Sequence, residues 1–251
     1  MAAIASIANP MAPREATPTA LPTWVETPTA TRIMGALSYA QALPDIAVVC
    51  GGSGIGKTYA ARQYASTGAH VWIATMTPAT SGVVPALEEV CAAIGIPAAN
   101  GAAPLHRAIV QRITGAAGLL IVDEAQHLIP AALDQLRGIH DAGGIGLVLL
   151  GSRDLHTRMA GGEAATTLER LRGRIGRRLA LGTSTASDAE ALAEACGVPA
   201  GGARKLLGEV ATKAGGLRSV VKLLRVAMIH SPGAAPFTES NLRAAWRDLA
   251  G

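Results

Sequence analysis

The stretch GGSGIGKT, residues 51–58, has the residue types and the spacing of a loop that cradles phosphate groups. Glycines let backbone N–H groups turn towards phosphate oxygens, and a helix that begins near Lys57 points its positive end at the same place. In such a loop the lysine reaches the outer phosphates of a nucleotide, and the Thr58 hydroxyl binds Mg²⁺. We therefore predict a site for ATP and Mg²⁺ formed by Gly51, Gly52, Ser53, Gly54, Ile55, Gly56, Lys57, Thr58 and Tyr59.

A second candidate group follows the apolar run LLIV, in the sequence LLIVDEAQH. Asp123 lies at the predicted carboxyl end of a buried strand, where open α/β sheets collect ligands, and would hold Mg²⁺. Glu124 would polarise the attacking water as a general base. A DE pair can also simply cap a helix after a strand, but a strand and two helices between Lys57 and Asp123 favour the catalytic interpretation.

A third polar group, Ser152, ends another apolar run, LVLLGS. It could orient the lytic water or sense the terminal phosphate, and Arg153 is the neighbouring alternative for this role. Ser152 could equally be the N-cap of a helix that starts at Asp154.

Apolar runs alternate with helical stretches in the order expected of a parallel sheet covered on both faces. We predict strands at 46–50, 70–75, 118–124, 145–152 and 178–182. The predicted helices lie at 31–42, 57–66, 83–95, 104–115 and 132–143, and an arginine-rich helix starts near residue 163. The strand at 70–75 is typical of ATPases with an additional strand between the two nucleotide motifs, and no NKxD-like guanine signature is present.

The rest of the chain divides by composition. Residues 1–30 are rich in Pro, Thr and Ala and are predicted to form a disordered arm, 31–182 an αβα core, and 183–251 a small helical lid. Three widely spaced cysteines indicate reduced thiols, and neither a signal peptide nor a membrane span is evident. We therefore expect a cytoplasmic protein. The net charge of +4 permits, but does not require, an acidic polymer as partner.

The motifs GGSGIGKT, LLIVDEA, LLGS, GRIGRR and GGLRSV together resemble the AAA+ ATPases, over roughly residues 31–229. Within this class, DEAQH and the helix RIMGALSYA are similar to the DNA-transposition ATPases of the phage Mu B type. The resemblance implies a P-loop AAA+ core with a parallel five-stranded sheet between helices, followed by a helical lid. It also implies ATP-dependent oligomers, as a ring or a filament, that coat double-stranded DNA without sequence preference and stimulate a transposase. Mu B-type proteins carry a separate N-terminal helix-turn-helix domain, and residues 1–30 are too few to form one.

The same resemblance gives roles to three arginines. In AAA+ assemblies ATP lies between subunits, and a neighbour inserts an arginine that neutralises charge on the γ-phosphate. Arg174, in GRIGRR, is the first candidate for this finger, and Arg177 is the second. Arg218, in GGLRSV, matches the lid arginine that touches phosphate in its own subunit, although it could also be an ordinary exposed arginine.

DNA contacts are predicted at the inner surface of such an assembly. The polar loop TMTPATSG suits phosphates, and two arginines lie on the predicted helix at 104–115. The candidates are Thr77, Thr80, Arg107 and Arg112, although solvated charges and an exposed loop explain the same residues equally well.

Two other functions share the same phosphate loop. An AAA+ switch that acts on a protein partner, as in secretion-associated or loader-like ATPases, is the main alternative to DNA binding. A small-molecule kinase is less consistent with Glu124 directly after Asp123 and with a lid arginine at Arg218.

Overall fold

The computed structural model describes residues 20–160, 165–231 and 236–250. Its centre is a parallel sheet of five strands: β1 (Ile46–Cys50), β2 (Val71–Thr75), β3 (Leu119–Asp123), β4 (Gly146–Gly151) and β5 (Ile175–Ala180). The strand order is β2-β3-β4-β1-β5. The parallel sheet confirms the predicted fold class. β4 lies between β1 and β3, so a full strand separates the two nucleotide motifs in space.

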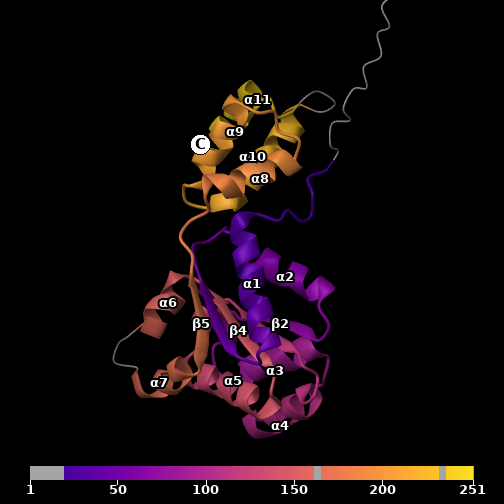
Figure 1. Cartoon of the computed structure of the whole chain (residues 1–251), viewed down its shortest axis with the longest axis vertical. Coiled ribbons are helices and arrows are strands. Elements are labelled where there is room, and N and C mark those ends of the chain that lie inside the picture. Colours follow the sequence, from indigo (N-terminus) through magenta and orange to yellow (C-terminus); the bar gives the residue numbers. More distant parts are fainter. Residues whose placement is uncertain (1–19, 161–164, 232–235, 251) are drawn as a thin grey trace, which may run out of the picture.

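Helices cover both faces of this sheet (Figure 1). On one face α1 (Pro28–Ala42) and α2 (Lys57–Thr67) pack on strand residues such as Val49, Ile121 and Val148. On the other face the apolar core is closed by α3 (Val83–Ile94), α4 (Ala102–Ile113), α5 (Pro130–Gly143), α6 (Arg153–Ala160) and α7 (Ala165–Gly173). Because β1, β3 and β4 are buried along their whole length, they read as continuous apolar runs in the sequence.

The last four helices form a second layer of packing with its own core. They are α8 (Ala186–Ala195), α9 (Gly202–Ala211), α10 (Gly216–His230) and α11 (Glu239–Ala250). Leu207, Leu223 and Leu242 are completely buried in this separate cluster. Figure 1 shows these helices stacked beyond the carboxyl end of the sheet, joined to β5 by a short connection.

The start of the described chain differs from the predicted arm of residues 1–30. Residues 1–19 lie outside the described residues. Within 20–30, Thr27, Thr29 and Ala30 are buried and α1 already begins at Pro28, with Thr27 as its N-cap. Leu21 and Val25 contact the core of the C-terminal helices, and Trp24 contacts the core beneath α1. These three apolar side chains hold residues 20–30 against the two cores, although the Pro and Thr content of this segment predicted disorder.

The last strand also differs, since β5 begins at Ile175 and not at residue 178. β5 is an edge strand, and its residues alternate between half-buried and exposed. Arg177 takes one of the half-buried positions, where its guanidinium donates to Gly35 O at 3.0 Å and lies 5.5 Å from the centre of the Tyr39 ring. A strand with one buried face is recognised by apolar residues at every second position. Arg177 takes one of these positions, so the start of β5 was not recognised from the sequence.

Two smaller turns complete the core. The 3₁₀ helices η1 (Pro78–Thr80) and η2 (Ala125–His127) follow β2 and β3 at the carboxyl edge of the sheet. Among the described residues, no helix is both long enough and apolar enough to cross a bilayer.

Candidate active site

The phosphate-binding loop connects β1 to α2 and is shaped by glycines. Gly54 and Gly56 have φ of 78° and 96°, in the left-handed region that glycine tolerates, and Gly56 is the N-cap of α2. Ile55 is buried in the core, so its side chain anchors the loop from below. The loop therefore presents backbone N–H groups and the start of α2 on its open side.

Gly51 and Gly52 differ in role from the rest of the motif. Their N–H groups donate to Gly151 O and Gly182 O, both at 3.1 Å, and so tie the loop to the end of β4 and to the segment that follows β5. These two N–H groups are therefore used by the protein, and the predicted phosphate donors reduce to those of residues 53–58. The side chain of Tyr59, the last residue of the predicted site, is 59% exposed.

Lys57 is the first residue of α2, and its side chain reaches back to the start of the loop. Its ammonium donates to Gly51 O at 3.0 Å and to Gly52 O at 2.9 Å. Burial lowers the pKa of Lys57, while the carboxylates of Glu124 and Asp123 act in the opposite direction. A cation held by two carbonyls is poised to exchange them for phosphate oxygens.

Asp123 and Thr58, both predicted to hold Mg²⁺, form a hydrogen bond although they are 65 residues apart. The Thr58 hydroxyl donates to Asp123 Oδ2 at 2.7 Å, and Asp123 is only 2% exposed. The other oxygen, Oδ1, accepts the N–H of Glu124 at 2.9 Å. A hydroxyl and a buried carboxylate are oxygen ligands of the kind Mg²⁺ takes together with nucleotide phosphates and water, so this pair fits the ion.

Glu124 follows in an unusual backbone conformation, with φ 55° and ψ 35°. Its carboxylate accepts a short hydrogen bond from the side-chain amide of Gln126. The amide oxygen of Gln126 in turn accepts the N–H of Ser152 at 3.0 Å. Gln126, which the sequence motif contains but to which no role was given, therefore links the ends of β3 and β4.

Ser152 has the capping role that was the alternative to phosphate sensing. Its Oγ accepts the N–H of Asp154 and bonds to an Asp154 carboxylate oxygen, both at 3.2 Å, at the start of α6. Ser152, Arg153 and Asp154 nevertheless line a cavity of about 380 Å³ beside the phosphate loop.

Another part of this cavity is lined by the connection between α9 and α10. Lys213, Ala214, Gly215 and Gly216 line it, and Arg218 Nη1 donates to Ser53 Oγ at 3.2 Å. The backbones approach so closely that a Cβ on Gly54 would lie 2.0 Å from Gly215 O. Arg218 thus lies where a lid arginine is expected, and Lys213 is a further cation that the sequence did not single out for this site.

Comparisons with known proteins agree with this geometry. Residues 42–159 match the AAA domain family, and 173–249 match the family described as Mu B transposition protein, C terminal. The chain is 37% identical to the ATP-dependent target DNA activator B of Escherichia phage Mu over 230 residues, covering 91% of this chain and 74% of that protein. It is also 37% identical to the Mu-like prophage FluMu DNA transposition protein B of Haemophilus influenzae, covering 78% of this chain and 70% of the relative.

The chain belongs to the Mu B family. Among solved structures, the Aeropyrum pernix ORC2 protein has the same fold, with a TM-score of 0.62, 19% identity, and coverage of 92% of this chain and 70% of that one. The AAA domain, the phosphate loop and the acidic end of β3 make this Mu B family member a P-loop ATPase.

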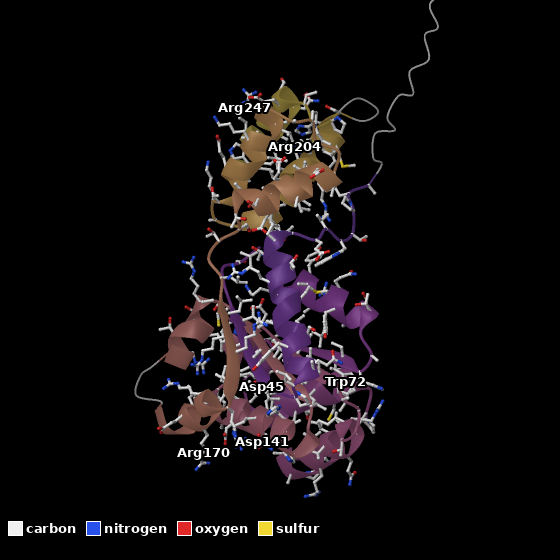
Figure 2. The ribbon with its side chains drawn as sticks, viewed as in Figure 1. Asp45, Trp72, Asp141, Arg170, Arg204 and Arg247 are labelled. Carbon is white, nitrogen blue, oxygen red and sulfur yellow. The ribbon has the colours of Figure 1, made fainter. Side chains whose placement is uncertain are left out.

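The two finger candidates of this Mu B family member have different surroundings. Arg174 lies between α7 and β5, is 61% exposed, and its Nη2 is 3.8 Å from Asp141 Oδ2. Ile175 pairs with Ile46 at the start of β1, whereas the phosphate loop follows the end of β1. Figure 2 shows Asp141 at the end of the molecule remote from the C-terminal helices. Arg174 therefore points away from its own nucleotide site, while Arg177 is held against α1 as described above.

The four candidate DNA contacts lie on two separate elements of the Mu B core. Thr77 and Thr80 form a capping box on η1, in which the Thr77 N–H donates to Thr80 Oγ1 at 2.8 Å. Arg107 and Arg112 are both exposed on α4. The threonine side chains thus already hold a turn, and the arginine side chains are accessible.

Proposed function

We propose that this Mu B family protein binds ATP and Mg²⁺, assembles on double-stranded DNA, and regulates transposition by capturing target DNA and activating a transposase. The match to the phage Mu activator over nearly the whole chain carries this proposal, because it includes both the ATPase core and the C-terminal helices. It favours DNA over a purely protein-directed switch. The free, buried cysteines are consistent with action in the cytoplasm.

The nucleotide would be held by this chain's own groups. Lys57 would leave Gly51 O and Gly52 O for the outer phosphates, and Arg218 would reach them from the lid. Thr58 and Asp123 would hold Mg²⁺, which neutralises charge developing on the phosphates. Glu124 is the base that would orient and deprotonate the attacking water.

Assembly would supply the missing part of the site. Arg174 is exposed and lies at the wrong end of β1 for its own phosphate loop, so it can act only on a neighbour's ATP. A closed ring or an open filament would repeat this contact from subunit to subunit. Such an arginine accelerates hydrolysis by about 10³–10⁵ in other nucleoside triphosphatases.

The exposed groups of η1 and α4 would meet the DNA backbone, so binding should be insensitive to sequence and sensitive to salt. We expect a duplex of arbitrary sequence to shift in a gel with ATP and Mg²⁺, and the affinity to fall by roughly 10³ between 50 and 200 mM salt for about six phosphate contacts. Arg107→Ala with Arg112→Ala should flatten this salt dependence, whereas a control change of the exposed Arg247→Ala, in α11, should not. Failure to bind plain duplex DNA at low salt with ATP would exclude the DNA-coating function.

A further inference from the structure

The turn after Glu124 is held from outside by a single arginine. Arg158, in the last turn of α6, donates through Nη1 to Gln126 O and through Nη2 to Leu128 O, both at 2.7 Å. These carbonyls belong to the short η2 turn and the residue after it, where a 3₁₀ helix leaves its last acceptors unpaired. A planar guanidinium with two parallel N–H groups can hold both carbonyls at once, which a single ammonium cannot do as well.

The residue that Arg158 holds by its backbone also holds the catalytic base by its side chain. The Gln126 amide oxygen faces the N–H of Ser152, so its NH₂ group must face Glu124. Glu124 itself has a left-handed backbone, which a residue with a side chain keeps only where its surroundings fix it. Arg158 and Gln126 therefore form one continuous chain of hydrogen bonds that supports the Glu124 carboxylate.

We propose that Arg158 is a positioning residue of the ATPase, which fixes the Glu124 carboxylate through the backbone and side chain of Gln126. Arg158 does not touch the nucleotide loop, because its guanidinium is occupied by the carbonyls of Gln126 and Leu128. Loss of Arg158 frees η2, lets the Gln126 amide move, and leaves Glu124 with several orientations. The binding groups Lys57, Thr58 and Arg218 keep their own contacts.

Arg158 also contacts the arginine-rich segment that contains Arg174, the proposed arginine finger. Arg172 Nη2 donates to the backbone oxygen of Arg158 at 2.9 Å, and Arg178 Nη2 donates to Arg172 O at 3.0 Å. Arg174 lies between these two arginines and its N–H donates to Leu171 O at 3.0 Å. This extension rests on the proposed function: engagement of Arg174 by a neighbouring subunit would be transmitted through Arg172 and Arg158 to Glu124.

Steady-state ATP hydrolysis by the full chain, without DNA, tests the positioning role and is independent of any DNA activity. We expect Arg158→Met to lower kcat about 10- to 100-fold, since a small misplacement of a catalytic group costs this much. The affinity for a fluorescent ATP analogue should stay within about twofold of the parent because the binding groups are intact. Arg158→Lys, which can still reach one carbonyl, should recover part of kcat, and the exposed Arg170→Met serves as the matched control with normal kcat.

A double-mutant comparison separates positioning from general damage. If Arg158 acts through Gln126, the Gln126→Ala change should lower kcat by itself, and adding Arg158→Met should lower it little further. Multiplied effects of the two changes, a parallel loss of nucleotide affinity, or normal kcat in Arg158→Met would overturn the proposal. A protein that hydrolyses ATP in this pattern but never binds DNA would keep the role of Arg158 and reject the proposed function.

Discussion

At the scale of single residues, the proposed catalytic groups are held in two hydrogen-bonded sets. Thr58 and Asp123 form one, and Glu124 and Gln126 form the other. In the proposed function, the first set would hold Mg²⁺, and the second would orient the carboxylate of the general base. Binding and hydrolysis are therefore assigned to different side chains and can be separated by mutation.

Glu124→Gln should remove the base while leaving the nucleotide groups intact. We expect kcat to fall by about 10²–10⁴, the usual contribution of a general base, while ATP affinity is kept. The measurement is single-turnover hydrolysis beside equilibrium binding of ATP. Turnover close to that of the parent would remove Glu124 from this role.

The motif residues could be predicted because their geometry is local: a strand, a loop and a helix start fix GGSGIGKT, and an apolar run places Asp123. The roles of Gln126 and Arg158 could not be predicted in this way. The partners of Arg158 are backbone carbonyls 30 and 32 residues away, and no residue type marks a carbonyl in the sequence. The use of the Gly51 and Gly52 N–H groups by neighbouring strands is equally invisible without the sheet.

At the scale of elements, a buried carboxylate joins α1 to α8. Asp188 is completely buried and accepts the N–H and hydroxyl of Thr29, both at 2.8 Å, and those of Thr185 at 2.8 and 2.9 Å. Burial alone would raise the pKa of Asp188, but these four hydrogen bonds outweigh it and hold the pKa below its ordinary value. The carboxylate thus fixes the C-terminal helices, which carry Arg218, to the start of the core.

Asp188→Asn should destabilise the protein by about 2–3 kcal/mol at neutral pH, because buried donors lose their acceptor. A carboxylate whose pKa is depressed by folding stabilises above its unfolded pKa, about 3.9, and this stabilisation is lost as the pH falls through the folded value. The difference in urea unfolding free energy between parent and variant should therefore shrink as the pH falls below about 4. The exposed Asp248→Asn is the control, and a difference that does not change with pH would contradict this role of Asp188.

The sequence predicted strands well where both faces of the strand are buried, and less well at the edge of the sheet and near the start of the described chain. β1, β3 and β4 are apolar throughout, so their bounds could be predicted within a residue or two. β5 has one half-buried face and an arginine on it, and residues 20–30 owe their order to contacts of Leu21 and Val25 with helices more than 160 residues later. Tertiary packing, and not local pattern, decides both segments.

At the scale of the whole molecule, the phosphate loop and the proposed finger Arg174 lie at opposite ends of the sheet. The phosphate loop and the C-terminal helices meet beyond the carboxyl end, whereas Arg174 lies beside the amino end, close to Asp141 (Figures 1 and 2). We propose that a complete active site needs two subunits. An isolated subunit would bind ATP and hydrolyse it slowly.

Mixing two impaired variants tests whether the active site is shared between subunits. Arg174→Ala keeps its own Glu124 but offers no finger, and Glu124→Gln lacks the base but offers Arg174. We predict that each variant alone binds ATP and hydrolyses it poorly. An equimolar mixture should regain a substantial part of the parent rate, because half of the contacts between unlike subunits combine an intact Glu124 with an intact Arg174. No gain on mixing, or normal hydrolysis by Arg174→Ala alone, would contradict the account.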